Sequence, residues 1–291
     1  MMADEDLAPP AIDQGDLVSP EGVQASLGDN LPGQTAMAEL LRQHDGKPPR
    51  SLLGRIFGSS PLTDDTRVLY NVALGEIEVA DALGALASGW VVLHSLPVSS
   101  GGSDIDHLVI GPGGVFIIAT LNHSKQTVWA SQRTLMVGGI RYPDIRNMEY
   151  EMGRVERLLS TAANRAVEVS AVLAVVAPKS LTVRQKHRDV EVLAASTLAD
   201  WLTMRRRVLS PDDVLEIAEA AERSTTWHQG DGPVIDTSDL RARFETLRLD
   251  VTRAWRLQLI WAGVISVVAA STFLGVSYVI LLSALGLWTP H

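Results

Sequence analysis

Apolar residues at helical spacing predict an amphipathic helix over residues 63–88. Six residues recur three or four positions apart and define one helix face: Leu69, Ala73, Glu76, Ala80, Leu83 and Ala87. Glu76 is the charged residue on this otherwise apolar face, whereas Glu78 and Asp81 lie off it. A carboxylate on the face that packs against the rest of the protein needs a partner or a function.

Short apolar segments separated by turn residues predict strands after this helix. Residues 90–98 form one such segment, and residues 105–110 and 115–120 flank the turn Gly-Pro-Gly-Gly. An antiparallel hairpin closed by this turn pairs residues whose numbers sum to 225. Cross-strand partners share a face of the sheet, so Asp106 is expected opposite Ala119, and Leu121 one step away.

The rest of the apolar pattern predicts helices that alternate with strands. Further strands are expected at 127–130, 133–143 and 167–178, helices at 147–163 and 210–223, and a strand that turns into a helix over 190–207. The helix at 210–223 opens with a serine cap, a proline and two acids, which is typical of a helix start. We therefore expect one α/β domain over residues 63–228, with a mixed sheet flanked by helices.

The C-terminal part of the sequence predicts one transmembrane helix. No charged residue occurs from Leu257 to Trp288, and about 20 apolar residues suffice to cross the hydrocarbon core of a bilayer. Residues 229–256 are expected to form a linker or juxtamembrane helix rich in arginine. Because positive residues favour the cytoplasmic side, we expect a single-pass, tail-anchored protein with its domain in the cytoplasm. Gly275 leaves a re-entrant segment as an alternative.

Charge and composition distinguish the N-terminal residues from the domain and the C-terminal helix. Residues 1–41 contain eight acidic residues and no Lys or Arg, so the net charge of −9 resides mainly there. Residues 1–62 are rich in Pro, Gly, Asp and Gln and are expected to form a disordered acidic leader. Within it, residues 51–58 form either a short amphipathic turn near the membrane or a simple linker. The absence of cysteine excludes disulfides, thiolate metal sites and cysteine nucleophiles.

Three stretches resemble a known family. These are LGEIEVADAL at 74–83, GWVVLHSLPV at 89–98 and GGSDIDHLVIGPGGVFIIATLNH at 101–123. Together they resemble the nuclease-related domain (NERD) family, a branch of the PD-(D/E)xK nucleases with a restriction-endonuclease-like fold. The resemblance covers roughly residues 68–180. It implies metal-dependent cleavage of phosphodiesters, with Glu76 and Asp106 as metal-binding and catalytic acids and with Mg²⁺ or Mn²⁺ as cofactor if the site is active.

The second strand of the hairpin departs from the family pattern. The resemblance implies an acid and a lysine separated by one residue, but this chain has Ala119 and Leu121 there. Neither side chain can bind a cation or donate a hydrogen bond, so the site is expected to be degraded. Lys125 would replace the missing lysine if its side chain reached back to the acids.

Three interpretations of function follow from this departure. The first is a catalytically degraded nuclease that serves as a binding or scaffolding module at the membrane. The second is an active nuclease with a rearranged lysine, Lys125. The third is a structural, membrane-associated interaction protein without nucleic-acid binding. The expected partners are the membrane and, for the first two interpretations, DNA or RNA. The sequence identifies no protein partner.

Overall fold

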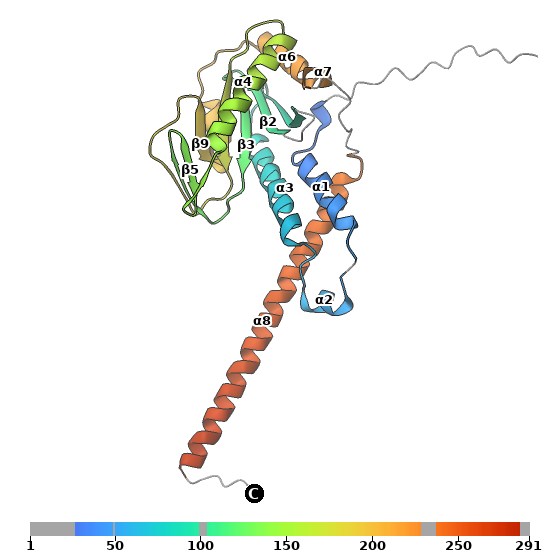
Figure 1. Ribbon diagram of the computed structural model, residues 1–291, viewed down its shortest axis with the longest axis vertical. Helices are drawn as coiled ribbons and strands as arrows, with labels where there is room; N and C mark the ends of the chain where they lie inside the picture. The colour runs from blue at the N-terminus through green and yellow to red at the C-terminus, as the bar shows by residue number, and fades with distance from the viewer. Residues whose placement is uncertain (1–26, 49, 99–103, 228–236, 286–291) are drawn as a thin grey trace, which may run out of the picture.

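The computed structural model describes residues 27–48, 50–98, 104–227 and 237–285. Figure 1 shows an α/β domain from which one long helix, α8 (Leu240–Ala284), extends away. The predictions for residues 1–26, for the loop before the hairpin and for Trp288 fall outside the described residues. The mixed sheet, its flanking helices and the apolar C-terminal helix confirm the fold class expected from the sequence.

The main sheet has five strands in the order β1-β2-β3-β7-β9. Its strands are β1 (Val91–Pro97), β2 (Asp104–Gly111), β3 (Gly114–Leu121), β7 (Val169–Val175) and β9 (Val190–Ala194). The first three strands are antiparallel to their neighbours, whereas β3, β7 and β9 run parallel. The β2–β3 hairpin closes at the pair of Gly111 and Gly114. From this pair to the pair of His107 and Ile118, the residue numbers of cross-strand partners sum to 225, which confirms the predicted register.

A smaller sheet in the order β6-β5-β4-β8 lies between β3 and β9 in the sequence. Its strands are β4 (Thr127–Ser131), β5 (Thr134–Val137), β6 (Ile140–Tyr142) and β8 (Ser180–Val183). The sequence predicted strands at 127–130 and 133–143, the second of which the structure divides into β5 and β6, but it did not predict β8. This strand has four residues, none of them buried, so no apolar run marks it, and its parallel pairing with β4 defines it.

Helices cover both faces of the main sheet. On one face lie α3 (Asp64–Leu83) and α5 (Leu198–Thr203), and on the other lie α4 (Asp144–Ala162) and α6 (Pro211–Glu222). On the first face, Val79 and Leu83 pack with Phe116 and Ile118 of β3. The predicted start of α6 is confirmed by a reciprocal capping box between Ser210 and Asp213. A short helix, α7 (Ser224–Trp227), follows it.

The segment before α3 is ordered where the structure describes it. It contains a 3-10 turn, η1 (Leu27–Asp29), and two helices, α1 (Gln34–Asp45) and α2 (Leu52–Phe57). Met37, Leu40 and Leu41 of α1 are buried against α3 and the first turns of α8. The expectation of a disordered leader is therefore wrong for the described residues after 26. The buried apolar residues of this segment, such as Met37 and Leu40, are covered by α3 and α8, which are distant in the sequence.

The long helix α8 connects the domain to the apolar segment without a break. Its first turns pack into the domain through Leu240, Phe244 and Leu247. Its later part is long and apolar enough to cross a membrane, and no part of the described protein buries its most apolar stretch. At 1.5 Å per residue, its 45 residues extend for about 68 Å. Only the end distal to the domain is therefore free to enter a bilayer.

Candidate acidic site

Glu76 and Asp106 come together where α3 lies on the end of β3. Gly75 permits this close approach, since a Cβ atom there would lie 2.9 Å from the Cβ atom of Asn122 and 3.1 Å from a methyl carbon of Thr120. The amide of Asn122 also donates a hydrogen bond of 2.6 Å to the Asn71 carbonyl oxygen of α3. The small residue at position 75 thus lets the carboxyl group of Glu76 lie beside the end of β3.

Glu76 is a buried acid that accepts a hydrogen bond from the backbone. Its side chain is 6% exposed, and the N–H of Gly33 donates to its Oε2 atom at 3.0 Å. Burial, followed by the charge of Asp106, raises the pKa of Glu76 well above its usual value, although the Gly33 hydrogen bond partly opposes this rise. These surroundings favour the protonated form of Glu76.

Asp106 also accepts a backbone hydrogen bond. The N–H of Thr120 donates to its Oδ2 atom at 2.6 Å. Although the residue as a whole is half-buried, burial of its carboxyl group raises the pKa of Asp106 to about 6, and the Thr120 hydrogen bond partly opposes this rise. A raised pKa is the result expected for a carboxyl group that is removed from water.

The strand β3 turns away from Asp106 at this point. The β2–β3 pairing ends at His107 and Ile118, so Thr120 contacts Asp106, whereas the sequence predicted Ala119 as its cross-strand partner. Ala119 and Leu121 pair with Leu173 and Val175 of β7 and pack against the apolar cluster beneath α4. At both positions the chain has apolar side chains that stabilise the core.

The N-terminal segment contributes to the surroundings of the acids. Besides the N–H of Gly33, the hydroxyl of Thr35 at the start of α1 donates a hydrogen bond to Asp104. The loop before α1 is held by the Ser95 hydroxyl, which donates to the Leu31 carbonyl oxygen at 2.9 Å. Sequence reasoning missed these residues because the segment has weak periodicity. Gly33, just before α1, was the available signal in the sequence. Glycine marks positions with a positive φ, and the φ of Gly33 is +73°.

Lys125 lies in the exposed turn between β3 and β4. Its φ of +65° belongs to the left-handed region, and its N–H donates to the Ala177 carbonyl oxygen at 3.0 Å. Among the described residues, its amino group forms no hydrogen bond or ion pair with Glu76 or Asp106. The role of Lys125 in a rearranged nuclease site stays a prediction.

A pair of histidines lies next to the acidic site. The Nδ1 atoms of His94 and His107 are 2.8 Å apart, and the Nε2 atom of His107 lies 3.3 Å from the Thr120 hydroxyl. Burial lowers the pKa of both rings, and the charge of His94 lowers the pKa of His107 further. Because His107 is completely buried, these contacts support a structural role for it.

The ligand set for a divalent cation is small at this site. Magnesium and manganese prefer several oxygen ligands, and one oxygen of each of the two acids already accepts a backbone N–H group. Within the described ranges, no group of three or more His, Cys, Asp or Glu residues is arranged to hold a metal ion. The metal-binding roles that the resemblance implies for Glu76 and Asp106 stay a prediction.

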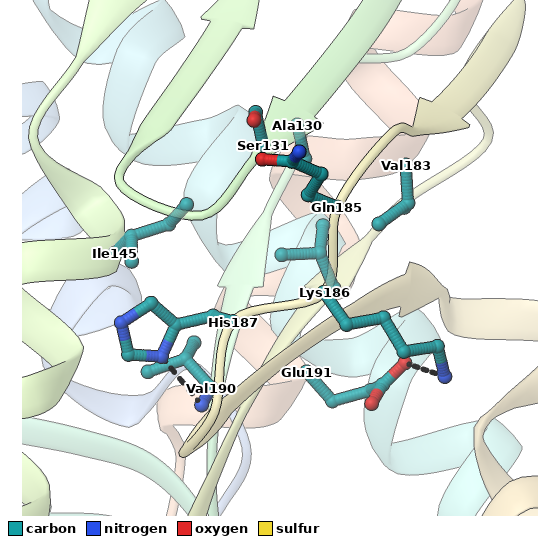
Figure 2. Close-up of a pocket in the computed structure, with 10 residues that line it drawn as sticks. Ala130, Ser131, Ile145, Val183, Gln185, Lys186, His187, Val190 and Glu191 are labelled. Carbon is teal, nitrogen blue, oxygen red and sulfur yellow. Dashed lines mark hydrogen bonds and ion pairs between the residues drawn. The ribbon is translucent and has the colours of Figure 1, made fainter.

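A surface pocket lies elsewhere, between β4, β8 and β9 (Figure 2). The polar groups at its rim are paired with one another. Lys186 forms an ion pair of 2.8 Å with Glu191, and the Nδ1 atom of His187 accepts the N–H of Val190 at 3.1 Å. The acids of the candidate site are not among its lining residues.

Comparison with known proteins confirms the class of domain. The two-sheet α/β fold with an acid on its first long helix and another on β2 is nuclease-like, and residues 72–176 match the family model described as the nuclease-related domain, NERD. This part of the chain is therefore similar to a nuclease-related domain, and the chain also has one helix that is able to span a membrane. No curated protein and no solved structure matched the chain.

Proposed function

We propose that this protein is a membrane-anchored nuclease-related domain protein that has lost phosphodiester cleavage and acts as a binding or scaffolding module. One observation carries the proposal. The two positions of β3 at which the family resemblance implies an acid and a lysine are Ala119 and Leu121, and both pack toward the apolar core. Metal-assisted cleavage needs ligands that hold the cation and a group that stabilises the developing charge.

The two remaining acids support the same proposal. Each carboxyl group accepts a backbone N–H, from Gly33 for Glu76 and from Thr120 for Asp106. Each bond partly offsets the cost of burying its carboxyl group within the fold. The alternative of an active nuclease relies on Lys125, whose exposed position argues against it.

We predict that the full-length protein in detergent micelles does not cleave DNA or RNA with Mg²⁺ or Mn²⁺. The expected result is substrate that stays intact at protein concentrations at which a known metal-dependent nuclease digests it completely. Gel electrophoresis of labelled single- and double-stranded substrates measures this directly. Metal-dependent cleavage that disappears in Asp106→Ala would contradict the proposal and favour the active alternative.

A double variant tests whether the fold holds the site geometry that the family resemblance implies. In Ala119→Glu combined with Leu121→Lys, we expect weak binding of Mn²⁺, with a dissociation constant on the order of 1 mM, because two or three carboxylates then surround one position. Isothermal titration calorimetry measures the binding, and Ala119→Gln combined with Leu121→Met is the matched control. A folded variant without any binding would count against the site geometry that the family implies.

A binding experiment distinguishes a module that binds nucleic acid from one that does not. A salt-dependent gel shift of DNA or RNA by the full-length protein would indicate a nucleic-acid partner, because phosphate contacts weaken as salt rises. No shift at low salt would favour a structural interaction protein without nucleic-acid binding, which is the third interpretation of the sequence.

The proposed orientation places the domain in the cytoplasm and the end of α8 across the membrane. It is supported by the arginines that precede the apolar run, among them Arg253 and Arg256. We expect a tag after His291 to be labelled only from outside the cell and a tag before Met1 only from inside. If both tags report the same side, a single-pass anchor is excluded.

A further inference from the structure

The short helix α2 lies beside α8 at the point where the charged part of α8 gives way to its apolar part. Figure 1 shows α2 as the element of the domain that projects furthest along α8. The contact involves Ala254, Leu257 and Trp261 of α8, and Arg256 is the last charged residue before the apolar run. The level of α2 is thus the level at which α8 is expected to enter the membrane.

The contact between the two helices is close and specific. A Cβ atom at Gly58, which ends α2 with a φ of +77°, would lie 2.5 Å from the Ala254 carbonyl oxygen. The indole N–H of Trp261 donates to the Ile56 carbonyl oxygen at 2.9 Å, and the Trp261 ring lies 4.9 Å from that of Phe57. A six-residue helix is not stable alone in water, so these contacts hold α2 in place.

The outward face of α2 is apolar and uncovered by the described protein. Leu52 is 77% exposed, Leu53 66%, Ile56 53% and Phe57 50%. Four large apolar side chains on one six-residue helix are unfavourable in water, at about 25 cal/mol per Å² of exposed apolar surface. Exposed arginines lie nearby, Arg55 on α2 and Arg253 and Arg256 on α8. This is the distribution found in helices that lie in a membrane interface.

Backbone groups at both ends of α2 form hydrogen bonds within the protein. The Ser51 side chain accepts the N–H of Gly54, the N–H of Gly58 donates to the Gly54 carbonyl oxygen, and Trp261 satisfies the carbonyl of Ile56. Unsatisfied backbone groups at helix ends are costly in lipid. Both ends of α2 are thus capped, and one cap comes from the helix that is expected to cross the membrane.

The geometry points to α2 as an interfacial helix that inserts Leu52, Leu53, Ile56 and Phe57 into the same bilayer leaflet through which α8 enters. This inference rests on the proposed membrane anchor. Trp261 lies five residues after Arg256, about 8 Å further along the axis of α8. If Arg256 lies among the headgroups, the part of α2 that contacts Trp261, at Ile56 and Phe57, lies about 8 Å below them, within the depth of an interfacial helix. Two contacts with one leaflet restrict the tilt and rotation of the domain above the membrane.

Spin labels at single cysteines test this inference, because the chain has no natural cysteine. The full-length protein is placed in phosphatidylcholine–phosphatidylglycerol vesicles with labels at Leu53→Cys, Met204→Cys or Phe273→Cys. Met204 is an equally apolar and exposed residue, at 77%, in the turn after α5, and Phe273 lies in the apolar part of α8. For Leu53→Cys we expect accessibility to a water-soluble nickel chelate on the order of tenfold below that of Met204→Cys.

Three outcomes would overturn the inference. If Leu53→Cys is as accessible as Met204→Cys while Phe273→Cys is shielded, α8 is an anchor but α2 is not inserted. If Phe273→Cys is itself accessible to the chelate, the membrane anchor fails and the inference fails with it. If the shielding of Leu53→Cys disappears when the protein is diluted in excess lipid, a second copy of the chain covers α2 in place of lipid.

The hydrogen bond from Trp261 has its own test in the same vesicles. Trp261→Phe keeps an aromatic ring against Phe57 but removes the donor to the Ile56 carbonyl oxygen. We expect a several-fold rise in the chelate accessibility of a label at Leu53→Cys, because the end of α2 is then unsatisfied in the interface. Trp255→Phe, at an exposed indole on the same helix, is expected to leave it unchanged. If the chelate accessibility of the label is unchanged in Trp261→Phe, the bond from Trp261 does not hold the end of α2 in the interface.

Discussion

Replacing Phe244 with alanine is expected to lower the free energy of unfolding of the domain by about 3–5 kcal/mol, the usual cost of removing a buried aromatic side chain. Phe244 is completely buried, and its ring centroid lies 5.7 Å from that of Tyr70 on α3. It also packs in the cluster that contains Leu40 of α1. The loss would therefore loosen the contacts that join α1, α3 and α8.

Urea unfolding of the full-length protein in detergent micelles, followed by tryptophan fluorescence, measures this loss. Leu249→Ala is the matched control, since Leu249 is on the same helix but 71% exposed, and a change within about 0.5 kcal/mol is expected there. Limited proteolysis should also cleave residues 27–62 faster in Phe244→Ala. Equal stability of the two variants would mean that α8 is not docked on the domain, and that the N-terminal segment is free, as its composition alone suggested.

The second large effect is expected from Asp106→Asn, which should stabilise the protein at pH 8. The pKa of Asp106 is raised from 3.8 to about 6 because its carboxyl group is buried, so the ionised form costs free energy in the folded state. One pKa unit corresponds to about 1.4 kcal/mol, and we expect a gain of about 1–3 kcal/mol. The asparagine oxygen can still accept the N–H of Thr120, and loss of the charge also relieves Glu76.

The sign of this effect predicts its pH dependence. A carboxyl group with a raised pKa binds its proton more tightly when folded, so its penalty is absent below about pH 4 and complete above about pH 6. The difference between Asp106→Asn and the unmodified protein should therefore grow over this interval. The contributions of His94 and His107, which remain in both proteins, cancel in the comparison.

Unfolding of both proteins at pH 4, 6 and 8 checks this dependence. Glu78→Gln, at an exposed acid of α3, is the control and should change stability by no more than about 0.5 kcal/mol. If Asp106→Asn instead loses more than about 2 kcal/mol at pH 8, Asp106 has a charged, hydrogen-bonded role. That result would reopen the question of a cation at this site.

Rigid attachment of the domain to α8 has a consequence for the proposed module. A flexible linker would let the domain sample many orientations, whereas α8 continues as one helix from its packed first turns into its apolar part. The surfaces that the domain offers to a partner are then held in one orientation relative to the membrane. A scaffolding role benefits from this arrangement because the partner loses less orientational freedom on binding a fixed surface.

The sequence alone determined the features that depend on local chemistry. The Gly-Pro-Gly-Gly turn set the register of the β2–β3 hairpin, because the turn length decides which residues pair. The Ser210 cap and Pro211 marked the start of α6, and the uncharged run after Arg256 marked the helix that is able to cross a membrane. The departure of Ala119 and Leu121 from the acid and lysine that the family resemblance implies was also visible, because it needs only the order of residues along β3.

Only the tertiary structure decided the surroundings of the acids. Gly33 is 43 residues from Glu76 in the sequence, yet its N–H donates to that carboxyl group. Thr120 replaced Ala119 as the contact of Asp106, because β3 leaves β2 after Ile118 and follows the parallel strand β7. The helices α1 and α2 form on surfaces supplied by α3 and α8. Such contacts join residues that are distant along the chain, and no local pattern of apolar and polar residues encodes them.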